Sequence, residues 1–337
     1  MPDSPADRAP RDETVASLGE AGVLRRVLAA LPPSTAIVGP GDDAAVIAAA
    51  DGRVVATTDT LVHGPDFRLA WTSGFDLGWK SAAVNLADVA AMGARPSALL
   101  VALTLPDDTP VRFVEQFGAG LAAACAQLAP GCAVEGGDLA ASDTLTVAVT
   151  ALGSLDGGQP VLRSGARPGD DVRIVGDVGV AARGLQLLFR RFTDAAGAPV
   201  PVTDDAMASL SPDDAVALSR QLAPVPPVSA GVEAARAGAH AMMDVSDGLA
   251  LDARRMASAS GVTIDLRTAA LGAHPDRALS GGEDHALLLA TPAGYAGPGR
   301  VIGVVRERGP APLSVDGAAW DEAGGWDPYR DWDAARG

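Results

Sequence analysis

The chain has 337 residues, of which 48% are hydrophobic and 20% are charged, and its formal net charge is −16. This length allows two ordinary domains with complete hydrophobic cores, and the composition is that of a folded protein rather than a disordered one. The negative charge argues against nucleic acid or an anionic membrane surface as the main partner, because both favour a basic protein surface.

The N-terminal part of the chain is predicted to contain a helix and a hairpin. Apolar residues recur at helical spacing over 14–31 and a proline pair follows, so we expect a helix that ends there. The β-like runs 44–50 and 54–58 flank Asp51-Gly52, a dipeptide that strongly favours a two-residue hairpin turn. The sequence therefore predicts that these two runs pair with each other.

The next segments are predicted to alternate between helix and strand. The pattern indicates helices over 76–93 and 110–128, and strands over 97–106, 132–137 and 144–155.

Lys80 is the only lysine of the chain. On the helix predicted over 76–93 it lies four residues after Asp76, so we expect the two side chains to form a modest ion pair on the helix surface.

A turn-rich stretch over 155–168 is predicted to separate two domains. We expect a disordered leader over 1–12, a first domain over 13–157 and a second domain over 158–337. Both halves mix strands and helices in similar proportion, so the predicted fold class is α/β (α+β). In the second half the pattern predicts strands over 171–176, 239–244, 262–267, 284–291, 299–305 and 313–316. It predicts helices over 178–191 and 247–260, and a connection over 194–213 that is followed by further helices up to about 238.

The sequence carries no signal for export or membrane insertion. No apolar run approaches the length of a membrane span, and the first residues lack the basic and apolar regions of a signal peptide. Cys125 and Cys132 have no neighbours with metal-ligand spacing and are expected to be reduced thiols. We therefore predict a cytoplasmic protein.

Six short segments place aspartate beside glycine or small apolar residues. A buried carboxylate needs a partner or a metal ion, so six such segments indicate one shared site. Divalent cations are the simplest ligands that gather several carboxylates, and a polyphosphate substrate is the simplest reason to bind several cations. The segments are GPGDDAAVI (39–47), ATTDTLV (56–62), VNLADVAAMGA (84–94), EGGDLA (135–140), MMDVSDGL (242–249) and LSGGEDHALLL (279–289).

Taken singly, several of these aspartates also fit ordinary structural roles. Asp43 follows two glycines in a segment that is equally typical of a turn, and Asp59 is expected at the end of a strand, where turns commonly begin. Asp138 follows a glycine pair that is expected to form a loop after a strand. Ser246 and Asp247 could cap a helix and complement its dipole.

Asp88 is the most informative aspartate of these six segments. It is expected on a helix whose other residues are almost all apolar, and Asn85 shares its face. A carboxylate in such surroundings is costly unless a cation or hydrogen-bond donors meet it, so we interpret Asp88 as a site residue. His285 is interpreted as a structural histidine, since the chain has no Ser/His/Asp or zinc-like spacing.

Other nucleotide-binding motifs are absent from the sequence. It contains no G-x-x-x-x-G-K-[ST], no G-x-G-x-x-G with an acidic partner, and no protein-kinase signature set.

Taken in order, the aspartate segments resemble the thiamine-monophosphate kinase family. DLGWKSAAVNLADVAAMGARP, LRSGARPGD, DVSDGL followed by Asp252, and a terminal GGW also match. The family shares its fold with aminoimidazole ribonucleotide (AIR) synthetase, selenophosphate synthetase and the hydrogenase-maturation dehydratase. The resemblance therefore implies a two-domain AIR synthetase (PurM)-like fold, with an N-terminal domain that contributes its sheet to a homodimer and a C-terminal α/β domain.

The activity that the resemblance implies is ATP-dependent phosphorylation of thiamine monophosphate to thiamine diphosphate, with several Mg²⁺ ions and direct in-line transfer. Bound cations would offset the repulsion between two phosphates, and the acceptor oxygen is already deprotonated, so no general base is expected. The implied metal ligands are Asp43, Thr57, Thr58, Asp59, Asp88, Asp138, Asp244 and Asp247. The implied ATP contacts are Gly137, Asp138, Arg163 and Ser246, and the implied substrate contacts are Glu283 and Trp326.

The segment LVHGPDF departs from the family pattern. Asp66 stands where the family usually has a substrate-contacting histidine. A carboxylate there would attract a thiazolium ring and repel a phosphate, so we expect Asp66 to affect substrate binding.

Two functions remain as alternatives to the kinase activity. One is that of another ATP-using enzyme of this superfold, and the other is that of a metal- and nucleotide-binding regulator without catalysis.

Overall fold

The computed structural model describes residues 13–39 and 45–321. Within these ranges the first half of the chain forms one mixed sheet with the strand order β1-β4-β2-β3. The strands β1, β4 and β2 are antiparallel neighbours, while β2 and β3 run parallel. The elements of this half are α1 (Val15–Leu18), α2 (Glu20–Ala30), β1 (Val55–Val62), α3 (Gly74–Ala91), β2 (Arg95–Leu105), α4 (Val111–Leu128), β3 (Ala133–Ala141) and β4 (Thr146–Ser154).

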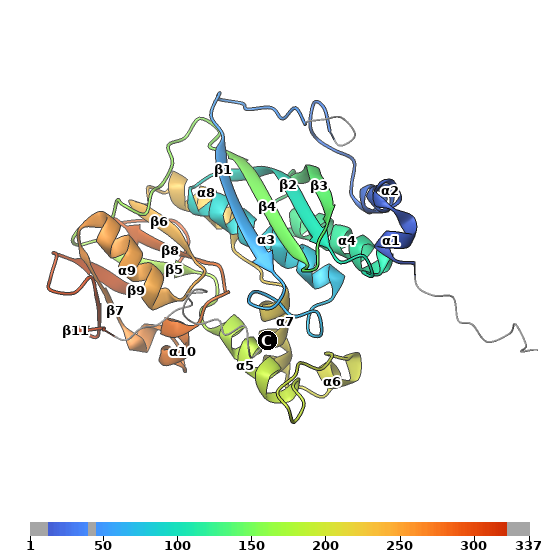
Figure 1. The fold of residues 1–337 in the computed structure, drawn as a ribbon. Helices are drawn as coiled ribbons and strands as arrows, with labels where there is room; N and C mark the ends of the chain where they lie inside the picture. The colour runs from blue at the N-terminus through green and yellow to red at the C-terminus, as the bar shows by residue number, and fades with distance from the viewer. Residues whose placement is uncertain (1–12, 40–44, 322–337) are drawn as a thin grey trace, which may run out of the picture.

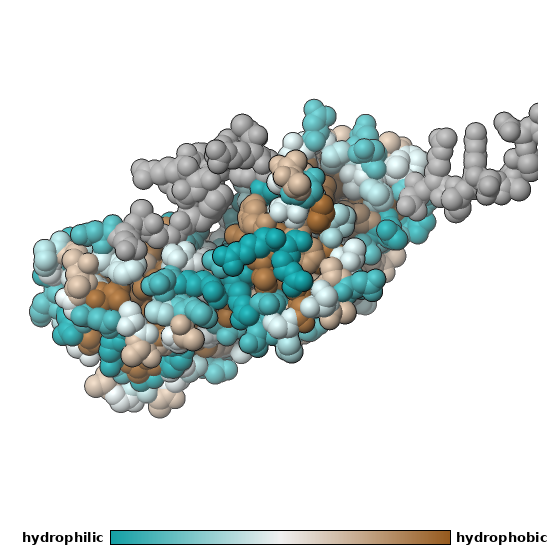
Figure 2. Space-filling model, turned by 90° about the horizontal axis from the view of Figure 1, so that it is seen from below, coloured by the Kyte–Doolittle hydropathy of each residue, from teal (hydrophilic) through white to brown (hydrophobic). Residues whose placement is uncertain are grey.

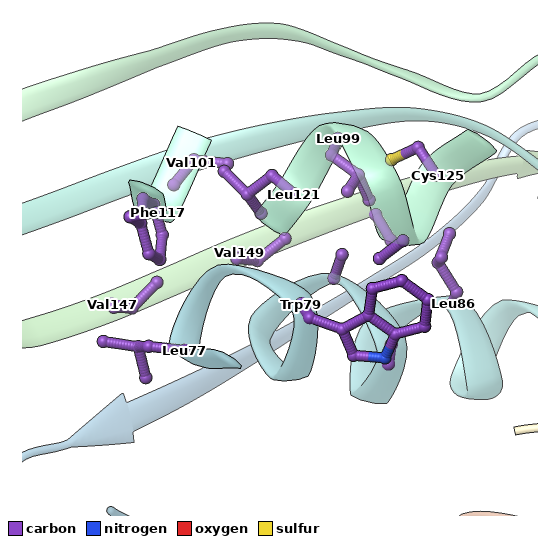
Figure 3. Packing of buried hydrophobic residues seen from close by; sticks show 14 of the residues in the cluster. Leu77, Trp79, Leu86, Leu99, Val101, Phe117, Leu121, Cys125, Val147 and Val149 are labelled. Atoms are coloured by element: carbon purple, nitrogen blue, oxygen red, sulfur yellow. The ribbon is translucent and has the colours of Figure 1, made fainter. Parts of the chain in front are cut away.

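Helices α3 and α4 lie together on one face of this sheet (Figure 1). Alternate side chains of the strands point toward the helices, because successive residues of a strand face opposite sides. Figure 3 shows the resulting core, with Leu77 and Leu86 of α3, Phe117 of α4, and Val147 and Val149 of β4 packed against one another. The sheet therefore has one covered face and one face that no helix of the described chain covers.

The second half forms a seven-stranded sheet with the order β11-β10-β7-β9-β5-β8-β6. Strand β8 lies between β5 and β6 and is buried along its whole length. The elements are β5 (Asp171–Val175), α5 (Val180–Arg191), α6 (Asp204–Ala208), α7 (Pro212–Leu222), α8 (Val228–Arg236), β6 (Ala241–Val245), α9 (Leu249–Ser260), β7 (Thr263–Leu266), η1 (Thr268–Ala270), α10 (Pro275–Ser280), β8 (Ala286–Thr291), β9 (Arg300–Arg306), β10 (Leu313–Val315) and β11 (Ala318–Ala319).

Helix α3 joins the two halves. Fifteen of its 18 residues are buried, and it contacts α8, β6 and β8 as well as its own sheet. Gly231 of α8 lies so close to α3 that a Cβ there would be 2.1 Å from the carbonyl oxygen of Ala90. Two indole nitrogens also cross the junction, since Trp79 donates to the carbonyl of Pro224 at 2.7 Å and Trp71 donates to that of Phe192 at 2.8 Å.

The predicted fold class is confirmed, since the structure is mixed α/β with two sheets. The predicted domain boundary stays a prediction, although the first sheet ends at Ser154 and the second begins at Asp171. Helices α6 and α10 were not predicted. The predicted leader over 1–12 lies outside the described residues.

The predicted N-terminal hairpin is wrong. Strand β1 pairs with β4, and residues 45–50 contribute only an isolated bridge between Val38 and Val46. The carboxylate of Asp51 instead accepts hydrogen bonds from Arg53 and from the backbone N–H of Gly157, which ties this turn to the end of β4. Long-range strand pairing has overridden a strong local turn signal here.

Two further positions were wrong in detail. Asp59 lies in the middle of β1, opposite Val149, rather than at a strand end. The EGGD segment lies inside β3, because the strand continues to Ala141 instead of ending in a loop. Its Gly137 has no space for a side chain, since a Cβ would be 2.0 Å from the carbonyl oxygen of Val101 on β2.

No helix among the described residues is both long and apolar enough to cross a membrane.

Gly231→Ala is expected to lower the free energy of unfolding by about 1–3 kcal/mol, because the new methyl group would push α8 away from α3. Urea unfolding monitored by tryptophan fluorescence measures the effect. The matched control is Gly118→Ala in α4, where a Cβ meets only ordinary contacts at 3.4 Å or more and helix propensity predicts a gain of about 0.5–1 kcal/mol. Equal stability of the two variants would contradict this account of the α3–α8 contact.

Candidate functional site

Carboxylates from both halves of the chain meet beside the C-terminal part of α3. Asp88 of α3 accepts a hydrogen bond at 3.0 Å from Oγ1 of Thr57, on the covered face of β1. Asp59 lies two residues further along the same face, and Asp244 approaches from the end of β6. His285 Nδ1 lies 3.5 Å from Asp244 Oδ2. The structure therefore brings together four of the residues that the sequence predicted as metal ligands.

The raised pKa values in this group indicate that too little positive charge lies near its carboxylates. Burial and, next to it, the nearby Asp244 carboxylate together raise the pKa of Asp88 to about 7, while the hydrogen bond from the Thr57 hydroxyl opposes the shift. Burial also raises the pKa of Asp59. For His285, burial disfavours the cation, but the Asp244 and Glu283 carboxylates outweigh it, so that the pKa is raised. Carboxylates that lie this close without sufficient cations hold protons instead.

Asp247 and Asp252 lie next to this group, and both are paired with one arginine. Arg255 of α9 donates to Asp247 at 2.6 Å and to Asp252 at 2.7 Å. Asp252 is fully buried, and burial together with the Asp244 carboxylate raises its pKa to about 6. It also accepts a hydrogen bond from the backbone N–H of Asp247 at 3.2 Å. The N-cap of α9 is Gly248, so Ser246 is not the N-cap of this helix.

The segment 281–285 crosses from this group to α3. Glu283 and His285 both have positive φ, at 71° and 51°, which non-glycine residues adopt rarely. The backbone N–H groups of Glu283 and His285 donate to the carbonyls of Ser246 and Val245, which holds the segment against the end of β6. Asp284 points away from the group and accepts hydrogen bonds from the N–H groups of Gly179 and Ala181 at the start of α5.

The expected surface pair between Asp76 and Lys80 is wrong. Asp76 forms a capping box with Ser73, whereas the Lys80 side chain is only 3% exposed and forms an ion pair with Glu283 from the other half of the chain. The i, i+4 spacing is correct, but α3 is buried on nearly all sides, so the lysine has no exposed helix surface on which to lie.

A cavity of about 860 Å³ opens next to this ion pair. We call the part of its lining around the buried Lys80 side chain the inner end; it consists of Lys80, Glu283, Asp66 and Ser246. Its outer part lies between the 64–72 segment, α5 and α7, and is largely apolar, with Trp71, Leu185, Leu188, Phe189 and Leu222 in its lining. Seen from below, hydrophobic and hydrophilic residues are interspersed over the surface (Figure 2).

Arg68 occupies part of the outer wall. Its guanidinium lies 4.9 Å from the ring centres of both Trp71 and Phe189, and the two rings meet edge to face at 5.1 Å. These cation–π contacts place the positive charge of Arg68 beside the aromatic residues of the cavity wall.

Other predicted site residues lie apart from the carboxylate group. Thr58 and Asp138 lie on the uncovered face of the first sheet, opposite Thr150 and Ala102 respectively. Gly137 is beside Asp138 on β3. Arg163 is exposed, on the loop before β5. Asp43 and Trp326 lie outside the described residues.

Sequence reasoning missed the inner lysine and the outer cavity wall. Lys80 could have been found from its apolar neighbours, because a lone lysine in an apolar helix needs a buried partner. Trp71, Phe189 and Gln221 are far apart in sequence and carry no motif, so only the tertiary structure brings them together.

The chemistry of the donors fits a hard divalent cation, since Thr57, Asp59, Asp88 and Asp244 offer hydroxyl and carboxylate oxygens in one region of the structure. Among the described residues, no three His, Cys, Asp or Glu side chains are close enough to hold a metal ion. Magnesium commonly retains waters and substrate phosphate oxygens in its coordination shell, so an incomplete protein donor set is compatible with it.

The family model for the AIR synthase related protein, N-terminal domain, matches residues 41–155. Together with the two-sheet fold and the carboxylate group beside a large cavity, this match defines an enzyme of the AIR synthase-related class.

Thiamine-monophosphate kinase from Mycobacterium tuberculosis is 39% identical over 95% of both chains. The structure of thiamine-monophosphate kinase from Stenotrophomonas maltophilia covers 88% of this chain and 95% of its own, with 33% identity and a TM-score of 0.71. AaThiL complexed with AMPPCP and TMP covers 96% and 99%, with 29% identity and a TM-score of 0.71. The chain belongs to the thiamine-monophosphate kinase family, and it is a kinase.

In metal-free buffer, Asp88→Asn is expected to gain stability relative to the unsubstituted chain as the pH rises from 5 to 8. The folded pKa of Asp88 is about 7, against 3.8 for the unperturbed group, so the folded state binds more protons between these values. The free energy of unfolding therefore falls as the pH rises through this window, by about 1–3 kcal/mol for this one group. Asparagine has no such titration and can keep the hydrogen bond from Thr57.

Urea unfolding at pH 5, 6, 7 and 8 with a chelator measures the difference between the two proteins, in which titrating groups that do not interact with Asp88 cancel. A difference that is independent of pH would contradict the raised pKa of Asp88.

Proposed function

We propose that this chain transfers the γ-phosphoryl group of ATP to thiamine monophosphate, giving thiamine diphosphate and ADP. The observation that carries the proposal is the position of the cavity, whose inner end lies beside the carboxylate group and whose outer part is apolar and aromatic. A substrate with a phosphate at one end and aromatic rings at the other matches this polarity. The substrate named for the relatives has this form.

Charge explains why such a reaction needs a carboxylate-rich site. An oxygen of the acceptor phosphate forms a bond to the γ-phosphorus while the bond to the β–γ bridging oxygen breaks and ADP leaves. Both reactants are anions, so their approach in line is opposed by repulsion. The protein's own contribution is to orient the two phosphates and exclude water from the cavity. No covalent phospho-enzyme residue is required.

We propose that Thr57, Asp59, Asp88 and Asp244 hold Mg²⁺, with Asp247 adjacent. When bound, Mg²⁺ would supply the positive charge that lets two phosphates approach each other. Thr58 and Asp138, on the opposite sheet face, and Asp43, outside the described residues, remain proposed ligands from the family resemblance alone.

The proposed ATP contacts are Gly137, Asp138, Arg163 and Ser246. Of these, Ser246 lines the cavity, next to Glu283. Asp66 and Glu283 are proposed to contact the substrate at the inner end. Trp326 is proposed to stack on the thiazolium ring, since an aromatic face attracts a cationic ring.

We also propose a homodimer that forms through the uncovered face of the first sheet. This face carries small side chains, among them Thr58 and Thr60 of β1, Ala102 of β2, and Ala148 and Thr150 of β4. A sheet face without a covering layer is normally buried against another element, and a second copy would supply that layer. Domains over 13–157 and 158–337 and a cytoplasmic location remain proposals, the latter supported by buried free thiols at Cys125 and Cys132.

Purified protein with ATP, Mg²⁺ and thiamine monophosphate is expected to form thiamine diphosphate and ADP in equal amounts, measured by chromatography. Asp88→Asn is expected to remain folded, by circular dichroism, and to lose turnover, because it removes a carboxylate at the site of highest negative charge. Absence of thiamine diphosphate above a no-enzyme control would refute the proposed function. Normal rates in Asp88→Asn would remove this residue from the site.

Asp66→His is expected to lower the KM for thiamine monophosphate. Asp66 lies at the inner end of the cavity, where its ionised carboxylate would repel the negative phosphate of the substrate. The side chain also accepts a hydrogen bond from the N–H of Val62 at 2.7 Å. Asp66→Asn keeps an acceptor for this bond and separates the loss of charge from the change of shape.

The matched control is Asp276→Asn, which removes an exposed carboxylate from the cavity lining. If the KM is unchanged or raised in both Asp66 variants, Asp66 does not limit substrate binding.

A further inference from the structure

The only lysine of the chain is placed where two anionic substrates would be brought together. Lys80 projects from α3, and its side chain is 3% exposed. Its ammonium group pairs with Glu283, and it lines the inner end of the cavity together with Asp66 and Ser246. A buried lysine is costly, and one ion pair repays that cost only in part, so the position calls for an explanation beyond stability.

The cavity lining contains two other residues with a permanent positive charge, Arg68 and Arg277. The Arg68 guanidinium lies over the rings of Trp71 and Phe189. Arg277 lines the cavity from α10. At the inner end, Lys80 therefore faces two carboxylates, Asp66 and Glu283, as the one ammonium or guanidinium group among the described residues there.

This arrangement leaves the inner end with net negative charge when both carboxylates are ionised. Lys80 lowers the pKa of Glu283 against the opposing effect of burial, and it acts in the same direction on Asp66, where burial dominates. Without Lys80, a phosphate entering here would meet only like charge. An ammonium group with three donors can bind a phosphate oxygen and keep a carboxylate partner at the same time.

We propose that Lys80 binds the phosphate group of thiamine monophosphate and thereby positions it for transfer, sharing its ammonium between that phosphate and Glu283. This inference rests on the proposed function and assigns a substrate contact within that site. Lys80 would then recognise the phosphate of thiamine monophosphate. Its substitution is therefore expected to weaken binding of thiamine monophosphate and not binding of ATP.

The first test uses the unsubstituted protein. Because Lys80 is the only lysine, labelling with ¹³C,¹⁵N-lysine gives one set of lysine side-chain NMR signals, provided that any purification tag is lysine-free. Saturating thiamine monophosphate is expected to shift the Cε and Nζ signals, and thiamine, which has the same rings without the phosphate, is expected to leave them almost unchanged.

If calorimetry detects binding of thiamine monophosphate while these signals stay in place, the proposal is wrong. If thiamine monophosphate is neither bound nor phosphorylated, the proposed function itself fails, which distinguishes the two outcomes.

The second test compares substitutions at this position. Lys80→Met is expected to raise the KM for thiamine monophosphate by about 10- to 100-fold, the range for loss of one charge-assisted hydrogen bond, with little change in the KM for ATP. Lys80→Arg keeps the charge and is expected to recover part of the affinity. Thiamine, tested as a competitive inhibitor, is expected to bind both variants alike.

The matched control is Arg95→Met, which breaks the Arg95–Asp156 ion pair near the opposite end of the first sheet. A folded Lys80→Met protein with an unchanged KM for thiamine monophosphate would overturn the proposal. If Lys80→Met does not fold, the NMR titration of the unsubstituted protein still decides the question.

Discussion

The burial of helix α3 is the constraint on which the rest of the structure depends. The helix lies between the first sheet, α4 and the second half of the chain, and glycines let its neighbours approach closely. A Cβ at Gly78 would be 2.0 Å from the carbonyl oxygen of Phe117, and one at Gly231 would be 2.1 Å from that of Ala90. Because a helix rises about 1.5 Å per residue, Lys80 and Asp88 are held about 12 Å apart along one rigid axis. The same helix therefore sets the spacing between the inner end of the cavity and the carboxylate group, and any shift of either half on α3 would change that spacing.

Hydrogen-bond satisfaction separates structural aspartates from those of the site. Asp284 accepts from two backbone N–H groups at the start of α5, and Asp265 accepts from Arg306, Ser314 and the N–H of Gly317. Both are buried, and both have the donors that a carboxylate requires. Asp88 receives one hydroxyl and lies beside Asp244, and its pKa is raised to about 7. The presence of aspartate in a buried segment is therefore not informative by itself, and the balance of hydrogen-bond donors against negative charge separates Asp88 from the aspartates with structural roles.

Much of the fold could be predicted from local pattern, because the long helices and inner strands have strong periodicity. The order of the aspartate segments also identified the family. The structure places Thr57, Asp59, Asp88 and Asp244 in one region, and their role as metal ligands stays a prediction. What failed depended on long-range contacts. The Asp51-Gly52 hairpin gave way to pairing of β1 with β4, and the i, i+4 pair of Asp76 and Lys80 gave way to an ion pair across the two halves. The aromatic wall around Trp71 and Phe189 could not be predicted, since its residues come from separate elements with no common pattern.

The site is built at a cost to the stability of the ligand-free fold. Asp88 and Asp252 are buried near Asp244, and the positive φ values of Glu283 and His285 add backbone strain at the same place. Each of these features opposes folding when cations and phosphates are absent. Residues that violate local rules are expected where function requires them, and the surrounding core must compensate. Here the compensation comes from α3, whose close contact with Gly231 of α8 joins the two halves. A looser junction would let the carboxylates of Asp88 and Asp244 separate and would relieve their repulsion, so the tight packing around α3 and the raised pKa of Asp88 have a common origin.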